Sequence, residues 1–140
     1  MYERSVQVPR LLAGAADVPP LPILATMQDA LNARYQTTFS RLGLALYRDG
    51  RDSVAYHGDT IARLLPEALV ATVSLGSPRR LLLRPTAGGA SIAYSLGWGD
   101  LLVMGGTCQR TWQHGIPKVA RADARIAVMF RPVWDPPSDG

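Results

Sequence analysis

The sequence predicts a mainly β fold, a sandwich or a barrel made of a single domain. The length of 140 residues, with 47% hydrophobic residues, is enough for one hydrophobic core and too short for two. Glycine, proline and aspartate residues separate several short apolar segments, as turn residues separate neighbouring strands. Many short strands at such spacing are typical of β sandwiches and barrels. The expected strands are residues 42–47, 68–75, 80–84, 91–96, 100–104 and 125–131.

One helix is expected ahead of these strands. A proline-rich turn at residues 19–22 separates an N-terminal extended segment from residues 23–36. In the second segment Leu24, Met27 and Leu31 recur at three- and four-residue spacing, as on the apolar face of an amphipathic helix. We therefore expect a helix over residues 23–36 that packs against the strands.

The composition limits the compartment and the partners. A net charge of +4 suits a polyanionic partner such as nucleic acid, although a GC-rich coding bias would also explain why every basic residue except Lys118 is arginine. No apolar run approaches the ~18 residues that cross a membrane, so neither a membrane partner nor a signal peptide is expected. The single Cys108 excludes an internal disulfide and favours a reducing cytoplasm.

Metal-binding residue types are easy to find because the chain has only two histidines. His57 opens the run His57-Gly58-Asp59, and residues two apart in an extended segment share a face, so His57 and Asp59 can bind one ion. His114 follows the apolar segment 101–104 and must come from another strand. Two histidines and one carboxylate form the facial triad that holds Fe(II) and leaves positions open for oxygen and a co-substrate. Taken alone, a histidine beside a carboxylate is more often a surface or packing pair.

The last expected strand carries two arginines on one face. In the run from Arg125 to Arg131, Ala127 and Met129 share the face of the arginines, and the alternate residues face the other side. A guanidinium pairs with a carboxylate through two charge-assisted hydrogen bonds, so two inward arginines predict an acidic ligand. The alternative is that both side chains extend from the strand end into solvent.

Together these features resemble the AlkB-like family of Fe(II)- and 2-oxoglutarate-dependent dioxygenases, which repair alkylated nucleobases. The order His-x-Asp, a later histidine and Arg-x5-Arg is similar to the motif set of that family. Residues 2–11, especially Val8-Pro9-Arg10, resemble the end of the family's substrate-lid region. The segments that carry the resemblance are 46–59, 73–80, 100–106 and 125–131, within a match over residues 39–132.

The resemblance implies a double-stranded β-helix, a cupin-like jelly roll, with one or two flanking N-terminal helices. It implies a single dioxygenase domain over residues 1–132, in which 1–22 are a remnant of the substrate lid, 23–36 the flanking helix and 39–132 the jelly-roll core. The tail 133–140 is expected to be flexible. Relatives usually have tens of residues ahead of this region, so the chain is expected to be an N-terminally short member.

The resemblance also implies roles for individual residues. The predicted triad would bind Fe(II) and act in catalysis, and 2-oxoglutarate and O2 would be the other cofactors. Arg125 would bind the distal carboxylate of 2-oxoglutarate, helped by the hydroxyl of Tyr47. Arg131 would lie close to the chelating end of the co-substrate and to the reaction centre.

The implied reaction converts 2-oxoglutarate to succinate and CO2 while an N-alkyl carbon of a base in DNA or RNA is hydroxylated and leaves as an aldehyde. Ala45 stands where the family usually has asparagine, and Ala127 where a polar residue, often asparagine, is common. Each lost hydrogen bond to the co-substrate would cost about 1.5 to 3 kcal/mol. Thr60 and Ile61 replace acidic residues that many base-repairing members carry. A related dioxygenase that hydroxylates a protein or small molecule, or a truncated member with little catalysis, is therefore the alternative.

Basic and aromatic residues are candidates for contact with alkylated DNA or RNA. Arginines bind phosphates, and bases stack on aromatic rings. Solvated turn arginines and core aromatic residues are the alternative interpretation. The candidates are Arg10, Arg48, Arg51, Arg79, Arg80, Tyr56 and Trp112.

For the oligomeric state the sequence gives no signal, and the chain is taken to be a monomer.

Overall fold

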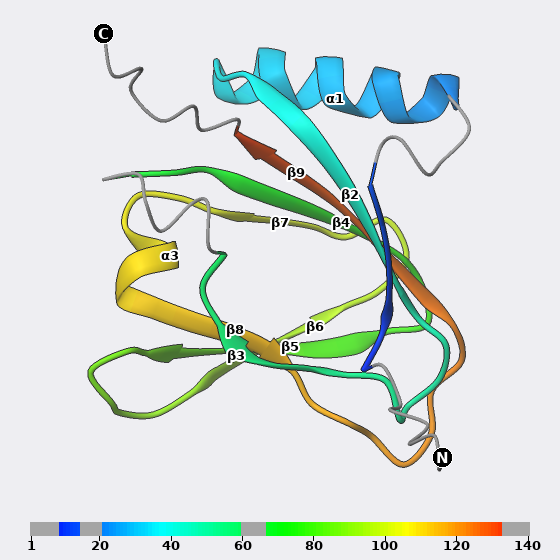
Figure 1. The fold of residues 1–140 in the computed structure, drawn as a ribbon, viewed down its shortest axis with the longest axis vertical. Helices are drawn as coiled ribbons and strands as arrows, with labels where there is room; N and C mark the ends of the chain where they lie inside the picture. The colour runs from blue at the N-terminus through cyan, green and yellow to red at the C-terminus, as the bar shows by residue number, and fades with distance from the viewer. Residues whose placement is uncertain (1–8, 15–20, 60–66, 133–140) are drawn as a thin grey trace, which may run out of the picture.

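Two antiparallel β sheets face each other and form the core of the protein (Figure 1). The computed structural model describes residues 9–14, 21–59 and 67–132. Within these residues the larger sheet has the order β1-β2-β9-β4-β7 and the smaller sheet the order β3-β8-β5-β6. The strands of the larger sheet are β1 (Leu11–Gly14), β2 (Phe39–Tyr47), β4 (Val70–Gly76), β7 (Leu101–Met104) and β9 (Arg125–Pro132). Those of the smaller sheet are β3 (Val54–His57), β5 (Arg79–Pro85), β6 (Ile92–Leu96) and β8 (Trp112–Ile116).

From β2 onward the chain passes back and forth between the two sheets. Strands β2, β4, β7 and β9 lie in the larger sheet, whereas β3, β5, β6 and β8 lie in the smaller one. All paired strands run antiparallel. This arrangement is the expected jelly roll, and the prediction of a mainly β fold with few helices is confirmed.

All six predicted strands are present, with ends that differ from the prediction by at most three residues. Strands β1, β3 and β8 were not among them. Each has only four or five residues, and β8 contains a glutamine, a histidine and a glycine rather than a continuous apolar run. The strands that sequence patterns miss are therefore short, and two of them, β3 and β8, carry the predicted metal ligands.

Helix α1 (Pro22–Tyr35) covers the outer face of the larger sheet (Figure 1). Proline suits the first helical position because its missing N–H would have no partner there. The helix ends at Gln36, which has a φ of 50° in the left-handed region that often closes helices. The side-chain oxygen of Asn32 accepts the backbone N–H of Phe39 at 2.6 Å, which ties the helix to the start of β2. The predicted flanking helix is confirmed.

Strand β9 is buried on both faces. On the outer face Val128 and Phe130 pack with Leu31 of α1. On the inner face Ala127 and Met129 belong to the core between the two sheets. Packing of α1 against the outer face of β9 therefore helps to fix the position of its inner face, which lies next to the site.

Some predicted segments lie outside the described residues. They are most of the expected lid remnant 1–22, Thr60 and Ile61, and the expected tail 133–140. Among the helices of the described ranges, none has the length and apolar composition needed to cross a membrane.

Candidate active site

The two histidines lie opposite each other on neighbouring strands. The register of the β3–β8 pair places His57 directly across from His114. Directly opposed residues of an antiparallel pair share one face of the sheet, and the ring centroids here are 4.3 Å apart. The pairing of one short strand with another thus brings together two residues that are far apart in the chain.

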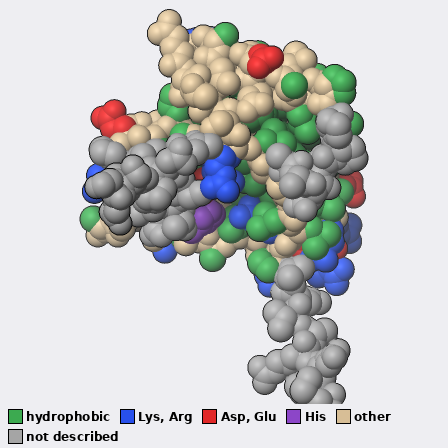
Figure 2. Space-filling view, turned by 45° about the horizontal axis from the view of Figure 1, so that its top comes forward, with side chains coloured by type: hydrophobic (Ala, Val, Ile, Leu, Met, Phe, Trp, Pro, Cys, Tyr) green, Lys and Arg blue, Asp and Glu red, His purple; other side chains and the backbone are tan. Residues whose placement is uncertain are grey.

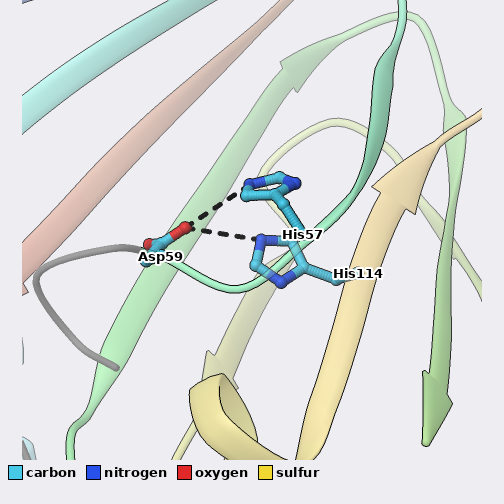
Figure 3. Close-up of side chains that lie close together, drawn as sticks. All are labelled: His57, Asp59 and His114. Atoms are coloured by element: carbon cyan, nitrogen blue, oxygen red, sulfur yellow. Dashed lines mark ion pairs between the residues drawn. The ribbon is translucent and has the colours of Figure 1, made fainter. Parts of the chain in front are cut away.

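Asp59 completes a cluster of three candidate metal ligands (Figure 3). Its Oδ1 lies 3.5 Å from Nε2 of His57 and 3.6 Å from Nε2 of His114. One ligand atom from each residue lies within 4.8 Å of the others. Ligand atoms about 2 Å from a shared ion are roughly 3 to 3.5 Å apart, so the cluster fits one metal ion with small adjustments. Two imidazoles and one carboxylate are the donor set of non-heme Fe(II) sites.

Hydrogen bonds fix the orientation of these ligands. Nδ1 of His57 lies 2.8 Å from the carbonyl oxygen of Ala55, and this contact orients the ring so that Nε2 faces Asp59. The backbone N–H of Asp59 donates to Oε1 of Gln109 at 2.7 Å. Gln109 is 2% exposed and belongs to the short helix α3 (Cys108–Thr111) between β7 and β8. The segment that leads to His114 therefore also holds the backbone of Asp59.

Arg131 pairs with the second oxygen of Asp59. Its Nε donates to Oδ2 at 2.7 Å. Burial opposes the ionisation of Asp59, but its contact with His57 and the charge of Arg131 outweigh burial, so the pKa of Asp59 lies well below its usual range. Burial, together with the charge of His57, lowers the pKa of His114 to about 4. At neutral pH the carboxylate is ionised and the imidazole of His114 is neutral, which are the forms that bind metal ions.

A pocket between the two sheets contains both this cluster and Arg125. In Figure 2 a histidine side chain lies at the surface beside basic side chains. Apolar side chains line the pocket between the metal cluster and Arg125, and Arg10 and Tyr47 line it as well. The apolar lining residues include Leu81, Ile116, Ala127 and Met129.

Arg125 is a buried cation with unused hydrogen-bond donors. It is 1% exposed, and its Nη2 donates to Oγ of Ser74 at 2.7 Å. Within the described residues its Nε and Nη1 have no hydrogen-bond partner. Burial lowers the pKa of Arg125, because it disfavours the charged form. A carboxylate would satisfy both donors, and the alternative of a side chain that extends into solvent is wrong for Arg125.

Tyr47 and two alanines form the wall beside Arg125. Tyr47 is 1% exposed, and the centroid of its ring lies 5.1 Å from the guanidinium carbon of Arg125. Ala45 and Ala127 are direct partners in the β2–β9 ladder, and both are buried. The two departures from the family pattern thus fall at one place and make the same part of the wall apolar.

Three of the candidate nucleic-acid contacts are exposed arginines. Arg48 pairs with Asp52, with 2.8 Å between Nε and Oδ2, and Arg51 pairs with Asp49, with 3.0 Å between Nη2 and Oδ2. Arg80 lies on β5 and is also exposed. These three side chains are accessible to a phosphate.

Arg79 is in the interior, so the predicted phosphate contact is wrong for this residue. It is 2% exposed, and its terminal nitrogens donate to the backbone carbonyl oxygens of Asp49, Asp52 and Pro117. The neighbours Arg79 and Arg80 differ because adjacent strand residues face opposite sides of a sheet. The sequence alone did not show which of the two points inward.

The two aromatic candidates do not line the pocket of the metal cluster. The guanidinium of Arg84 stacks on the ring of Tyr56 at 3.8 Å from its centroid, and the Tyr56 hydroxyl lies 3.0 Å from Oγ of Ser91. Trp112 is half-buried and lines a separate groove with Leu83 and other side chains.

Two polar residues of the site were not predicted, Ser74 and Gln109. Ser74 is completely buried in β4, and Gln109 is almost completely buried in α3. A serine inside an apolar strand was a signal for Ser74, because a buried hydroxyl needs a hydrogen-bond partner. Gln109 lies in a helix of only four residues, and nothing in the neighbouring sequence indicated a contact with Asp59.

Comparisons with known proteins agree with this geometry. A family model described as the 2OG-Fe(II) oxygenase superfamily matches residues 15–131. The alpha-ketoglutarate-dependent dioxygenase alkB homolog 3 of Mus musculus is 32% identical over 127 residues, which cover 84% of this chain and 44% of that protein. The DNA oxidative demethylase ALKBH2 of Homo sapiens is 27% identical over 124 residues, which cover 82% of this chain and 48% of that protein. The chain thus spans less than half the length of these two relatives.

The fold has a similar solved structure, that of OsALKBH1, with a TM-score of 0.62 at 17% identity over 82% of this chain and 65% of that one. The family description names Fe(II) and 2-oxoglutarate, and the His-Asp-His cluster provides the metal ligands that such a family needs. The predicted cofactors, Fe(II), 2-oxoglutarate and O2, are thereby confirmed. The chain belongs to the 2OG-Fe(II) oxygenase superfamily, and within it its sequence is similar to the AlkB homologues named above.

Proposed function

We propose that this chain oxidatively dealkylates N-alkylated bases in DNA or RNA, with Fe(II), 2-oxoglutarate and O2. The observation that carries the proposal is one pocket that contains both a cluster of three metal ligands and a buried arginine with unpaired donors. A metal ion and a dicarboxylate would each find matching groups there. The name of one relative, a DNA oxidative demethylase, supports alkylated nucleic acid as the substrate.

At the metal end His57, Asp59 and His114 would bind Fe(II) on one face and leave the other positions open. When bound, Fe(II) and 2-oxoglutarate would supply the oxidation with O2, of which one oxygen atom enters succinate, formed with loss of CO2, and the other hydroxylates the alkyl carbon, which leaves as an aldehyde. Arg131 keeps Asp59 ionised through its 2.7 Å hydrogen bond. Gln109 holds the backbone of the same residue.

At the other end Arg125 would bind the distal carboxylate of the co-substrate. Its Nε and Nη1 are available, and Ser74 holds its third nitrogen in place. The hydroxyl of Tyr47 would add a further hydrogen bond. The apolar side chains between the two ends exclude water from the space where the keto acid would lie, which strengthens both sets of polar contacts.

Nucleic acid would be attracted by exposed arginines rather than by a dedicated groove. Arg51 and Arg80 are exposed, and the net charge of the chain is +4. Contacts of this kind release counterions, so the affinity for nucleic acid would fall steeply as the salt concentration rises.

The first test is anaerobic titration of the protein with Fe(II) and then 2-oxoglutarate. Binding of the keto acid to the metal gives a metal-to-ligand charge-transfer band in the visible spectrum. The wild-type protein is expected to show this band, and His57→Ala is expected to lose it. Absence of the band in the wild type would contradict the proposal at its first step.

The second test is turnover of a methylated oligonucleotide in air. Succinate and formaldehyde are expected in equal amounts, together with the unmodified base. Succinate without loss of the methyl group would show that the enzyme oxidises its co-substrate but does not act on nucleic acid, and would favour a protein or small-molecule substrate instead.

A further inference from the structure

Arg10 enters the pocket, although its place in the sequence suggested a contact with nucleic acid. The residue immediately precedes β1, is half-buried, and lines the same pocket as the metal cluster and Arg125. Its Nη1 donates to the hydroxyl oxygen of Tyr47 at 2.9 Å. The side chain is therefore directed inward, toward the wall against which the co-substrate would lie.

Three arginines surround the ring of Tyr47. The guanidinium carbons of Arg10, Arg79 and Arg125 lie 5.7, 5.5 and 5.1 Å from its centroid. Within the described ranges none of the three forms an ion pair. Arg79 is bound by three backbone carbonyl oxygens, and they leave only its Nε unpaired. Among the described residues Arg10 and Arg125 each donate to only one side-chain oxygen, so no described carboxylate balances their charges by an ion pair.

Arg10 lines the same pocket as the three metal ligands and Arg125. It therefore borders the space between the metal end and the carboxylate end. An anion in that space would be attracted by Arg10 and would reduce the repulsion among the arginines.

We propose that the side chain of Arg10 binds 2-oxoglutarate, and that it contacts the distal carboxylate of this keto acid together with Arg125 and Tyr47. This inference rests on the proposed use of the pocket by 2-oxoglutarate. Because Arg10 donates to the Tyr47 oxygen, the hydroxyl proton of Tyr47 is free to be donated to the same carboxylate. Arg10 would thus act through its own charge and through the orientation of Tyr47.

Hydrogen bonds fix the backbone on both sides of Arg10, whereas among the described residues its side chain has a hydrogen bond or ring contact only with Tyr47. The carbonyl oxygen of Pro9 accepts the N–H of Ser53 at 2.8 Å, and Leu11 pairs with Leu46 in the β1–β2 ladder. Among the described strands β1 lies at the edge of its sheet and pairs with β2 alone. A keto acid that binds Arg10 would therefore also stabilise β1 against the sheet.

The experiment compares Arg10→Gln with Arg34→Gln by anaerobic titration of the Fe(II)-loaded proteins with 2-oxoglutarate. Arg34 is an exposed arginine of α1, so its substitution removes the same charge far from the pocket. Loss of one charge-assisted contact is expected to raise the dissociation constant of 2-oxoglutarate about tenfold in Arg10→Gln, with no change in Arg34→Gln. The affinity for Mn(II) without the keto acid is expected to be equal in both variants.

Hydrogen exchange provides a second measurement. Addition of 2-oxoglutarate to the metal-loaded wild type is expected to slow exchange of the amides of β1, and this protection should be lost in Arg10→Gln. Equal dissociation constants for 2-oxoglutarate in both variants, with weaker binding of an oligonucleotide only in Arg10→Gln, would overturn the inference and make Arg10 a nucleic-acid contact. A wild type without any charge-transfer band would instead refute the proposed function, and this inference would fail with it.

Discussion

The two ends of the pocket differ in how completely their charged groups are paired. At the metal end Oδ1 of Asp59 faces both histidines, Oδ2 accepts from Arg131, and the backbone N–H donates to Gln109. At the other end Arg125 donates to Ser74, and its Nε and Nη1 have no hydrogen-bond partner within the described residues. The protein itself arranges the metal ligands, whereas the opposite end keeps donors that a bound anion would pair.

This difference has an energetic consequence. Removing one member of a paired, buried set leaves its partner uncompensated and is destabilising, whereas removing an unpaired buried charge can stabilise the protein. Substitutions at the two ends should therefore affect ligand binding in the same direction and the stability of the ligand-free protein in opposite directions.

The largest effect is expected from Asp59→Asn. The amide lacks the charge that binds the metal, and it leaves Arg131 without its partner. The affinity for Mn(II), measured by calorimetry, should fall by more than about 100-fold, and the midpoint of urea unfolding without metal should fall as well. Asp29→Asn on the exposed face of α1 serves as the control. An affinity within tenfold of the wild type would show that Asp59 is not a metal ligand.

Arg125→Met should give the opposite pattern. Loss of two charge-assisted hydrogen bonds is expected to raise the dissociation constant of 2-oxoglutarate about 100-fold, while the affinity for Mn(II) stays unchanged. Without ligand, the free energy of unfolding should be unchanged or higher by about 1 kcal/mol, because an unpaired buried charge is removed. A clear loss of stability in urea would mean that Arg125 is paired in the ligand-free protein, and the proposed difference between the two ends of the pocket would be refuted.

Gln109→Leu tests whether a contact outside the triad organises the metal end. Leucine has a similar size but cannot accept the N–H of Asp59. The affinity for Mn(II) is expected to fall about tenfold, as for other substitutions that act through a metal ligand. Gln109→Glu keeps an acceptor and should restore most of the affinity. Equal losses in both variants would indicate a packing role for Gln109 rather than a hydrogen-bonding one.

The smallest effect is expected from Ala127→Asn, which adds a hydrogen-bonding side chain to the apolar wall beside Arg125. The affinity for 2-oxoglutarate should increase by a few-fold, to about tenfold at most. Without the keto acid the amide oxygen can accept from Arg125, but the buried NH2 group would lack an acceptor, so the protein should unfold at a lower urea concentration. Ala93→Asn on the exposed face of β6 should change neither quantity. Unchanged binding in Ala127→Asn would mean that the keto acid does not reach this part of the wall.

The parts of the site that could be predicted from the sequence depend on rare residue types and on strand periodicity. His57 and His114 were identifiable because the chain has no other histidine, and the alternation in β9 placed Arg125 on the inner face. Arg79 and Gln109 could not be placed in the same way. Each acts through contacts with segments 27 to 50 residues away, such as Asp52 for Arg79 and Asp59 for Gln109, which depend on the packing of loops rather than on a local pattern.

The pairing of His57 with His114 has a mechanical consequence for the smaller sheet. Within the described part of the chain β3 is one of the two edge strands of that sheet, and its ladder with β8 is irregular between Val54 and His57. An ion held by both imidazoles would join β3 to β8 at the point where their backbone pairing ends. Metal binding would therefore stabilise the pairing of the edge strand, and chelation of the ion would loosen β3 before it disturbs the rest of the two sheets.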